Sequence, residues 1–351
     1  MIDNRILKQT SEWLKDTGPH SDIVISSRIR LARNFESFPF SHWAGKKKRK
    51  EVVDIAESAI SELKALKGAM LLRMKEISDL DKQFLLERHL LSREMVADTD
   101  SKSVFISKTE VISTMINEED HLRIQVMQSG LNLSEAWKIA DALDDELSKK
   151  VDFAFDPNIG FLTSCPTNAG TGLRASVMLH LPALSMTNQI NRVVQAISKL
   201  GLVVRGLNGE GTDAEGNLYQ VSNQVTLGQS ESETIDNLER IIKQLIGHEE
   251  NARTQMMKQK KEMVNDKIFR ALGTLRNAFI ISSKETIELI SMVRMGIDLG
   301  VITDVNRKCL NELFLLTQPA HLQRIEGRML AQSDRDAKRA DLIRATLSAK
   351  D

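Results

Sequence analysis

Five arginines stand in apolar or glycine-rich stretches, where an unpaired cation would be costly. They are Arg28, Arg30, Arg123, Arg174 and Arg205. The first two alternate along a predicted strand, so both side chains should project from the same face. Guanidinium groups bind phosphate oxygens in bidentate pairs, and five of them could clamp a triphosphate and neutralise charge during phosphoryl transfer. Taken singly, each arginine is more typical of an ordinary surface or salt-bridge residue, so the hypothesis depends on the whole set.

Two carboxylates in turns could hold the group that receives the phosphate. Glu119 lies in NEEDH, and Glu210 lies in GLNGEGT, where glycines let the backbone approach a ligand closely. A guanidinium donates two hydrogen bonds to one carboxylate, so the pair could orient a nitrogen in line with a γ-phosphate. Because arginine titrates above ~12, this chemistry needs positioning and electrostatics more than a strong base. The alternative is that both segments are plain acidic turns, which are common in loops.

Cys165 lies in the segment TSCPTNAGTGLRAS, directly after Ser164. The serine hydroxyl, the turn amides and nearby arginines could favour its thiolate form, which would help to orient a guanidinium. The alternative is a small buried residue at the end of a strand. His89, in ERHLLS, ends a predicted helix and by itself predicts a capping or packing role.

Several common motifs are missing from the sequence. It contains no GxxxxGK[ST] segment, no GxGxxG pattern, no HRD and DFG set, and no CxxC or HExxH. These absences argue against a P-loop NTPase, an ordinary protein kinase and a common zinc site. If the protein uses ATP, it must hold the phosphates in another way, and the arginines are the candidates.

The composition predicts a globular protein without a membrane anchor. The chain has 351 residues with 48 basic and 48 acidic ones, and zero net charge argues against a dedicated nucleic-acid binder. Two cysteines, Cys165 and Cys309, fit a reducing cytosol better than a disulfide-linked secreted protein. Neither a signal peptide nor an apolar run of ~18 residues is found, so we expect a cytoplasmic protein.

Hydrophobic periodicity predicts an α+β protein. Closely spaced strands favour antiparallel pairing, because parallel neighbours need a long crossover. From residue 230 onwards the pattern is almost entirely helical, with N-cap signals at 230–232 and at Ser282. We therefore expect a short segment 1–20, an antiparallel-sheet domain 21–240 and a helical domain 241–351. The predicted strands are 22–30, 70–77, 103–107, 111–116, 122–127, 161–164, 174–181, 202–205 and 218–227, and the predicted helices of the sheet domain include 46–66, 80–91, 134–149 and 186–200.

In this order, four motifs resemble those of the phosphagen (guanidino) kinase family. They are SSRIRLAR from Ser26, NEEDHLRI from Asn117, CPTNAGTGLRASV from Cys165 and VRGLNGEG from Val204. The match covers roughly residues 21–227. The resemblance implies a catalytic domain of the glutamine-synthetase-like class, with an antiparallel sheet flanked by helices. It also implies an enzyme that uses ATP with Mg²⁺.

The same resemblance implies roles for individual residues. Glu119 and Glu210 would grip the guanidinium, and Cys165 would assist. No residue is assigned to a metal. The nucleotide would be bound by Ser26, Ser27, Arg28, Ile29, Arg30, His89, Arg123, Arg174, Ala175, Ser176, Val177, Met178, Arg205, Gly206, Leu207, Asn208, Gly209 and Glu210.

Two departures favour protein arginine over small guanidines as the acceptor. Family members that act on small guanidines carry a helical domain before the SSRIR strand, whereas here about twenty residues precede it and a helical region follows the sheet. This layout resembles the bacterial protein-arginine kinase branch of the family. Near the end, RDAKRA is similar to that branch's phosphoarginine-sensing motif. Its residues are Arg335, Asp336, Ala337, Lys338, Arg339 and Ala340.

Independently of the resemblance, the two arginines of RDAKRA would lie one turn apart on a helix and could grip a phosphorylated group. Considered alone, the segment is typical of a solvated helix face. The leading hypothesis is ATP-dependent phosphorylation of arginine side chains in proteins, which marks them for regulated proteolysis. The resemblance further implies an activator protein and the Clp protease system as partners, and homodimers formed through the helical domain.

Two other functions are compatible with parts of the pattern. One is a kinase of free arginine or another small guanidino compound. The other is a non-catalytic adaptor that binds phosphoarginine through the helical domain. The presence of all five arginines, both carboxylates and the cysteine argues against the adaptor, which would be expected to lack at least one of them.

Overall fold

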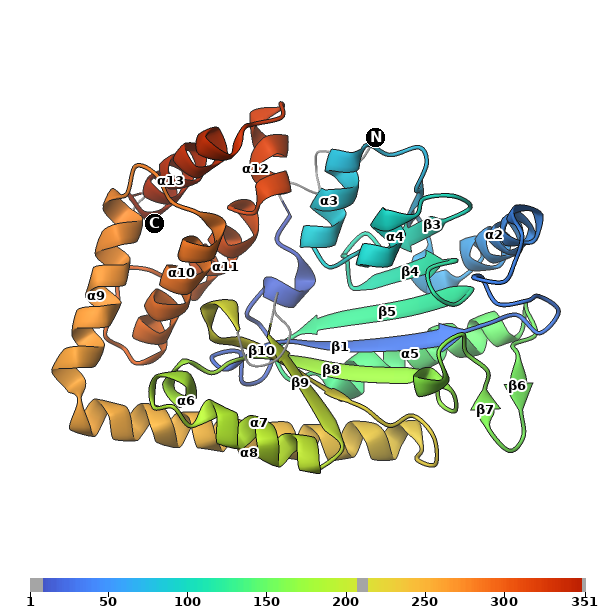
Figure 1. The fold of residues 1–351 in the computed structure, drawn as a ribbon, viewed down its shortest axis with the longest axis horizontal. Helices are drawn as coiled ribbons and strands as arrows, with labels where there is room; N and C mark the ends of the chain where they lie inside the picture. Colours follow the sequence, from blue (N-terminus) through green and yellow to red (C-terminus); the bar gives the residue numbers. More distant parts are fainter. Residues whose placement is uncertain (1–8, 207–213, 349–351) are drawn as a thin grey trace.

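The centre of the fold is an antiparallel sheet, which a computed structural model describes together with the rest of residues 9–206 and 214–348 (Figure 1). Within these residues, eight strands pair in the order β2-β3-β4-β5-β1-β8-β10-β9, and each neighbouring pair is antiparallel. A separate two-stranded ribbon contains β6 (Phe155–Asp156) and β7 (Gly160–Phe161). The strands of the main sheet are β1 (Val24–Arg33), β2 (Met70–Arg73), β3 (Ser103–Ile106), β4 (Ile112–Ile116), β5 (Leu122–Ser129), β8 (Leu173–His180), β9 (Leu202–Gly206) and β10 (Leu218–Asn223).

Helices connect the strands and then form a region of their own after β10 (Figure 1). Among the described residues, no helix is both long and apolar enough to cross a membrane. The helices between strands are α2 (Lys46–Ser61), α3 (Asp79–Glu87), α4 (Arg93–Ala97), α5 (Leu133–Ser148), α6 (Pro182–Met186) and α7 (Ile190–Lys199). Those after the sheet are α8 (Glu231–Gln259), α9 (Lys261–Asn277), α10 (Ser283–Asp298), α11 (Arg307–Leu316), α12 (Pro319–Glu326) and α13 (Gln332–Ser348). Short 3-10 helices are η1 (Glu12–Leu14), η2 (Lys64–Leu66), η3 (Pro166–Asn168) and η4 (Glu215–Asn217).

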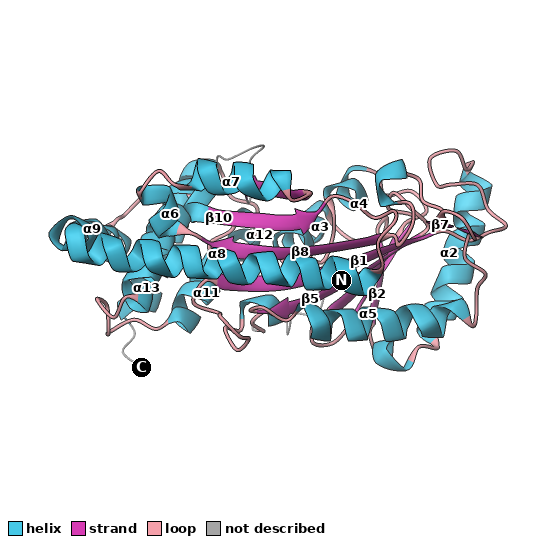
Figure 2. Cartoon of the chain, turned by 90° about the horizontal axis from the view of Figure 1, so that it is seen from below, coloured by secondary structure: helices cyan, strands magenta, loops and turns pink. Residues whose placement is uncertain are grey.

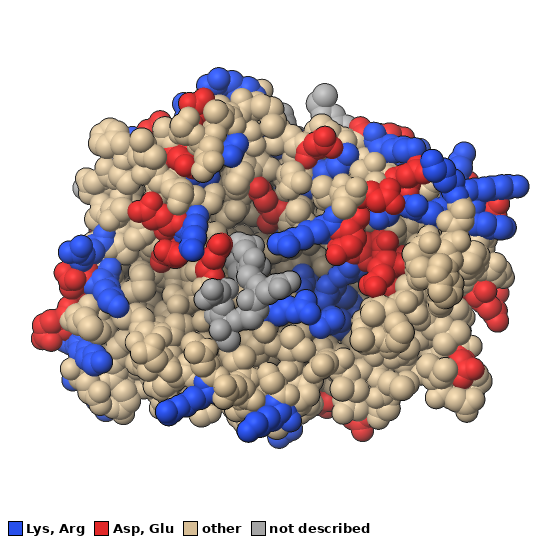
Figure 3. All heavy atoms as spheres, in the orientation of Figure 1, with Lys and Arg blue, Asp and Glu red and all other residues tan. Residues whose placement is uncertain are grey.

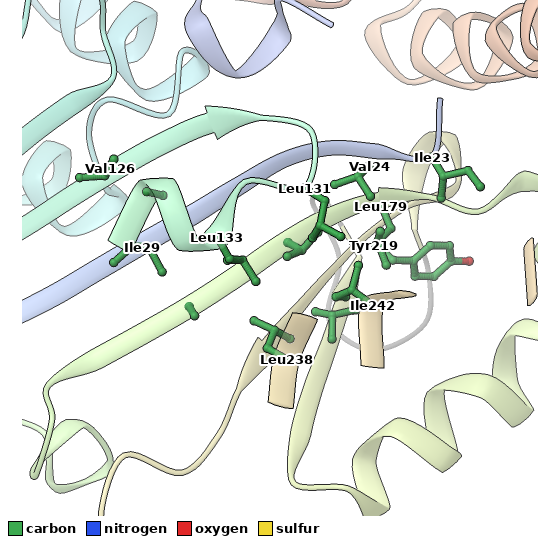
Figure 4. Packing of buried hydrophobic residues seen from close by; sticks show 14 of the residues in the cluster. Ile23, Val24, Ile29, Val126, Leu131, Leu133, Leu179, Tyr219, Leu238 and Ile242 are labelled. Carbon is green, nitrogen blue, oxygen red and sulfur yellow. The ribbon is translucent and has the colours of Figure 1, made fainter. Parts of the chain in front are cut away.

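One face of the sheet is buried against α5 and α8, which lie across it in the view from below (Figure 2). Alternate strand residues such as Ile29 of β1 and Val126 of β5 point to this side (Figure 4). They form one cluster with Leu133 of α5 and with Leu238 and Ile242 of α8. Each fully buried aliphatic side chain contributes about 1.5–3 kcal/mol. This layer therefore fixes the orientation of the strands.

The opposite face of the sheet is covered at one end by the first described residues and the helical region. Trp13 of η1 and Leu315 of α11 pack against Met127 of β5, Met178 of β8 and Leu218 of β10. Polar and charged side chains occupy the same face beyond this cluster. The helical region thus forms one wall of the space on this face of the sheet.

Helix α12 is fixed to α3 by a carboxylate. Glu87, the last residue of α3, accepts hydrogen bonds from the backbone amides of Ala320 (2.8 Å) and His321 (3.1 Å), and it lies 2.7 Å from His321 Nδ1. Arg324 of α12 also pairs with Asp81 of α3. The free amides at a helix N-terminus attract anions, so Glu87 stabilises α12 at this position.

Helix α8 runs without interruption through the boundary expected at residue 240. It begins after the N-cap Ser230, whose side chain forms a capping box with Glu233, and it continues to Gln259. The helical path breaks at Lys260, which has a φ of −141° and a ψ of 36° and precedes α9. We therefore propose that α8 belongs to the sheet domain and that the boundary lies near Lys260.

Most predicted elements are found within a few residues of their expected ends, including the three closely spaced strands β3, β4 and β5. The N-cap predicted at Ser282 begins α10, and its side chain accepts a hydrogen bond from the amide of Glu285. The helix expected over 186–200 corresponds to α7, which begins only at Ile190. Asn188, with a left-handed φ of 57°, separates α7 from the short α6, which precedes the expected range except for Met186. The strand expected over 161–164 is reduced to the short β7.

A buried carboxylate joins α8 to the start of α6. Glu249 is fully buried and accepts hydrogen bonds from the backbone amides of Ala183 and Leu184, each 3.0 Å long. It also forms an ion pair with Arg253 at 2.9 Å. Removing one partner of such a pair leaves the other charge buried without compensation.

We predict that Glu249→Ala lowers the free energy of unfolding by about 3 kcal/mol, because it leaves two amides and one cation with fewer partners. Chemical denaturation measures the change. The matched control is Glu250→Ala, since Glu250 is exposed on the same helix and its loss should change stability by about 0.5 kcal/mol or less. Similar small losses in the two variants would contradict the role assigned to Glu249.

Candidate active site

Strand alternation brings the predicted arginines to the open face of the sheet. On β1, Arg28 and Arg30 point away from α5 and α8, because Ile29 between them is buried in the core. Arg30 lies opposite Arg174 of β8 in the strand register. Arg123 occupies the same face of β5. Three neighbouring central strands therefore present cations to one space.

These side chains line a cleft of about 1030 Å³ between the sheet and the helices α3, α4, α10 and α11. Figure 3 shows basic side chains inside the hollow and acidic side chains gathered along one rim. The cleft thus has a positive floor and a negative rim. The predicted site residues that line it are Arg28, Arg30, His89, Glu119, Arg123, Arg174, Met178, Arg205 and Gly206.

Arg28 is held by two polar side chains, one on β10 and one on β8. Its Nη2 donates to Gln220 Oε1 at 2.9 Å, and its Nε donates to Ser176 Oγ at 3.3 Å. Burial, together with the positive charges of Arg123 and Arg174, lowers its pKa to about 10. The guanidinium is therefore fixed in place while its charge is only partly compensated.

Arg30 and Arg174 show the same lack of compensation. Burial and then the charge of Arg28 lower the pKa of Arg30, and burial and then the charge of Arg205 lower the pKa of Arg174. The buried Nε of Arg30 has no hydrogen-bond partner in the described part of the chain. Cations that depress one another's pKa are stabilised by an anion placed among them. The residues of the floor therefore fit a polyanion such as a triphosphate.

The acidic rim lies in the turn between β4 and β5. Burial alone would raise the pKa of Glu118, but its ion pair with Arg123 and several hydrogen bonds outweigh burial, so its pKa is lower than usual. Glu119, in contrast, is exposed at the cleft, and partial burial with the charges of Asp120 and Glu118 raises its pKa. Glu118 thus holds Arg123 in place. The carboxylate of Glu119 lines the cleft instead, where it could stabilise a bound cation.

The cysteine segment is tied to this same turn. Ser164 donates its hydroxyl to the backbone carbonyl of Glu119 (3.0 Å) and its amide to the carboxylate of Asp120 (2.6 Å). The next residue, half-buried Cys165, lies close enough to Arg174 to act on its charge. Glu119 and Arg174 therefore line the cleft, and Cys165 lies near both of them without lining it.

Strand alternation places some of the predicted nucleotide-site side chains outside the cleft. The runs 26–30 and 174–178 are predicted as continuous, but the side chains of Ile29, Ala175 and Val177 are fully buried on the opposite face of the sheet. Ser27 donates to the carbonyl of Gly130 at 2.8 Å and so fastens the loop before α5. These four side chains support the strands and do not line the cleft.

The other predicted residues lie in three kinds of place. Ser26 is buried two positions before Arg28, and Ser176 accepts a hydrogen bond from Arg28. Leu207, Asn208, Gly209 and Glu210 lie outside the described residues, between β9 and η4. The second predicted carboxylate is therefore known from the sequence motif alone.

His89 follows α3 with a left-handed φ of 59°. Its carbonyl accepts a hydrogen bond from Gln125 Nε2 at 2.7 Å, and its ring packs edge-on against Trp13 with centroids 4.8 Å apart. Burial, followed by the charge of Arg28, lowers the pKa of His89 to about 4. The imidazole is therefore neutral at neutral pH, and it faces the cleft beside the arginines.

Several cleft residues are missed by the sequence analysis. Gln125 and Gln220 lie on the same strand faces as the arginines, but this becomes visible only when the pairing register is known. Glu118 could have been found, because it stands directly before Glu119 and five residues before Arg123, in a short turn between strands. The remaining polar residues along the cleft are Glu87, Ser92, Arg93, Glu94, Ser222 and Gln318.

The described ranges contain no group of three or more His, Cys, Asp or Glu side chains arranged to hold a metal ion. Mg²⁺ commonly keeps several waters and is bound through substrate phosphates with one or two carboxylates. The cleft offers the carboxylate of Glu94 for this role. This residue fits a Mg²⁺ ion that arrives with a nucleotide.

The RDAKRA segment lies in α13, and its two arginines have different surroundings. Arg339 is buried and donates to the carbonyls of Thr317 and Ile281, each at 2.8 Å, and it also pairs with Asp336. It thereby joins α13 to the end of α11 and to the loop before α10. Arg335 is half-buried and donates to the backbone carbonyl five residues before it, at 2.8 Å.

We predict that a fall in pH destabilises the wild type more than it destabilises His89→Gln. The folded-state pKa of about 4 lies below the ordinary value of 6.5, so between these values only the unfolded state gains a proton at His89. Stability is therefore lost as the pH falls through this window. One pKa unit corresponds to about 1.4 kcal/mol, so the extra loss should be about 2 kcal/mol after allowance for partial exposure. Urea unfolding at a series of pH values measures it, and parallel curves would contradict the buried neutral state.

Comparison with known proteins identifies the family. The family model for the ATP:guanido phosphotransferase C-terminal catalytic domain matches residues 51–252. The model for the protein-arginine kinase McsB C-terminal domain matches residues 261–351, so the two matches meet near Lys260. Among solved structures, one similar chain is the duplicated taurocyamine kinase from Schistosoma mansoni with bound transition state analog components. The two structures superpose with a TM-score of 0.61 at 27% sequence identity, and the match covers 67% of this chain and 34% of the taurocyamine kinase chain. Lombricine kinase has a TM-score of 0.58 at 27% identity and covers 66% and 67% of the two chains.

Curated relatives are similar over nearly their whole length. A protein-arginine kinase from Halothermothrix orenii is 48% identical over 347 residues, which is 99% of both chains. Another from Desulforamulus reducens is 49% identical over 343 residues, covering 97% of this chain and 96% of its own. The chain therefore belongs to the protein-arginine kinase family of ATP:guanido phosphotransferases.

Proposed function

We propose that the chain transfers the γ-phosphoryl group of ATP to arginine side chains of proteins. The observation that carries this proposal is the divided cleft, with arginines of lowered pKa on the floor and Glu119 on the acidic rim. A polyanion and a cationic acceptor would each be stabilised on a different side of the same space. Phosphoryl transfer requires this arrangement, because catalysis depends on positioning and charge neutralisation.

The floor is proposed to bind the nucleotide phosphates. Arg28, Arg30 and Arg174 lie on central strands whose backbones are hydrogen-bonded to neighbouring strands on both sides. They therefore need little rearrangement when negative charge develops on the transferred phosphoryl group. Arg123 is oriented by Glu118, and Arg205 stands at the end of β9. Mg²⁺ supplies further charge neutralisation on the phosphates when it is bound. Neutral His89 offers a ring nitrogen to the nucleotide without adding charge.

The rim is proposed to bind the acceptor guanidinium. Glu119 would accept hydrogen bonds from it, and the ion pair would stabilise the carboxylate against its raised pKa. Glu210 is proposed as the second carboxylate from the sequence motif. Cys165, beside Arg174 and behind the Glu119 turn, would help to orient the acceptor.

Protein arginine is preferred over free arginine because the full-length relatives at 48–49% identity are protein-arginine kinases. The kinases of small guanidines are similar at 27% identity. Transfer to free arginine or another small guanidine remains the second candidate, since the cleft chemistry would serve both acceptors. A purely binding role is disfavoured by the cost of keeping uncompensated arginines in a catalytic arrangement.

We further propose that the helical region senses phosphoarginine through Arg335 and its neighbours and contributes to dimer formation. An activator protein, the Clp protease system, a role in regulated proteolysis and a cytoplasmic location are proposed from the family resemblance. The support in this chain is the match of residues 261–351 to the C-terminal domain of protein-arginine kinases. The half-buried position of Arg335 leaves it better placed than Arg339 to meet a ligand.

We predict that Glu119→Gln lowers kcat by about 10²–10³-fold, because it removes a charge that stabilises the acceptor in the transition state. ATP should bind with little change. Acid-free mass spectrometry of a basic client protein incubated with Mg-ATP measures the product, and calorimetry measures ATP binding. The control is Glu135→Gln on the exposed side of α5. A parallel loss of ATP affinity would show that Glu119 serves the nucleotide.

We also predict different outcomes for the two arginines of RDAKRA. Arg339→Ala should lower the free energy of unfolding by about 3 kcal/mol, because it removes buried hydrogen bonds from α13 to the end of α11 and to the loop before α10. Arg335→Ala should keep kcat and stability near wild type while it weakens binding of free phosphoarginine. Thermal unfolding and titration with phosphoarginine separate these effects. Undiminished phosphoarginine binding by Arg335→Ala would remove that residue from the proposed sensor.

A further inference from the structure

A second hollow of about 310 Å³ lies on the outer side of the acidic rim. Ser41 and His42, from the loop between β1 and α2, line one side of it, and Ser164 lines another. Glu118 and Glu119 line both this outer hollow and the cleft. The two spaces therefore share one wall, which is the turn that carries the proposed acceptor carboxylate.

An aromatic loop reaches the outer hollow through His42. It consists of Phe40, His42 and Trp43, and Trp43 is 74% exposed although tryptophan is usually well buried. The rings of His42 and Trp43 are 4.7 Å apart, and those of Phe40 and Trp43 are 6.0 Å apart. The amide of Trp43 donates to the carbonyl of Phe40 at 2.9 Å, so a turn holds the rings together. The loop thus presents a preformed aromatic surface.

Apart from Glu119, the charged side chains around the outer hollow already contact neighbouring groups. Arg49 pairs with Asp98 at 2.8 Å and donates to the carbonyl of Asp100 at 2.7 Å. Lys102 donates to the carbonyl of Glu94 at 2.9 Å. Besides the carboxylate of Glu119, the hollow therefore offers a ligand mainly hydroxyl, amide and aromatic groups. Such a surface suits peptide groups and uncharged side chains better than a phosphate or a lipid surface.

We propose that the aromatic loop and the outer hollow bind a segment of a protein substrate on one side of the target arginine, beyond its immediate neighbour. The inference rests on the proposed function, because an arginine that reaches Glu119 brings its own polypeptide to the shared wall. One of the two flanking segments then lies over the outer hollow. Trp43 supplies a large contact area there with little loss of side-chain entropy. Free arginine has no flanking segment and gains nothing from this surface.

The test compares three acceptors with wild type and Trp43→Ala. The acceptors are acetyl-Gly-Arg-Gly-amide and two longer peptides, which extend it with uncharged residues on the N-terminal or the C-terminal side only. We expect Trp43→Ala to raise KM about fivefold for one of the longer peptides, which is the effect of losing one aromatic contact. The KM of the tripeptide and the kcat of every acceptor should stay at wild-type values. His42→Ala should raise the same KM.

The matched control is Phe155→Ala, because Phe155 is 55% exposed on the β6–β7 ribbon, away from the outer hollow. Unchanged KM values for all three acceptors in Trp43→Ala, or equal increases for all three, would overturn the inference while the proposed function stands. A change in molecular mass by light scattering with unchanged KM values would assign the loop to a second copy of the chain instead. Failure of the wild type to phosphorylate any of the acceptors would count against the proposed function itself.

Discussion

Like charges held together on one face of a sheet are the constraint on which this structure depends. Arg28, Arg30 and Arg174 repel one another and are partly removed from water, which lowers the pKa of each. Such a cluster persists because the opposite face of the same strands is buried against α5 and α8. The apolar residues between the arginines therefore offset the repulsion and set its geometry. The core and the proposed phosphate site are two sides of the same strands.

The turn between β4 and β5 places the carboxylate of Glu119 on the rim of the cleft, apart from the arginines of the floor. Within that turn, adjacent glutamates have opposite pKa shifts, because Glu118 pairs with Arg123 and Glu119 does not. Ser164 then joins the turn to the cysteine segment. Glu119 can thus lie in the same cleft as five arginines without forming an ion pair with Arg123. This separation is what allows one cleft to receive both an anion and a cation.

Features of the fold and the site could be predicted from the sequence where they depend on residues close together in the chain. The alternation of Arg28 and Arg30, the capping residues Ser230 and Ser282, and the antiparallel class all depend on neighbouring residues, and the structure agrees with them. The hydrogen-bond partners of those arginines do not depend on neighbouring residues. Gln220, for example, reaches Arg28 only because of the register of three strands.

The same limit explains why a continuous motif does not show which of its side chains reach the cleft. Ile29, Ala175 and Val177 belong to motifs that are continuous in sequence, but a strand turns every second side chain to the other face. Arg339 stands on a helix whose sequence is typical of a solvated surface, yet carbonyls from two distant segments surround it. Burial of this kind is decided by tertiary packing, which a local pattern does not contain.

The carboxylate of Glu87 has a consequence for communication across the molecule. It lines the cleft, and it also holds the N-terminus of α12 through two backbone amides and His321. Separating α12 from α3 would leave these donors and the carboxylate without partners, so it would cost free energy. If a ligand of the helical region displaced α12 and thereby changed the affinity for a nucleotide in the cleft, linkage would require the nucleotide to change the affinity for that ligand by the same factor.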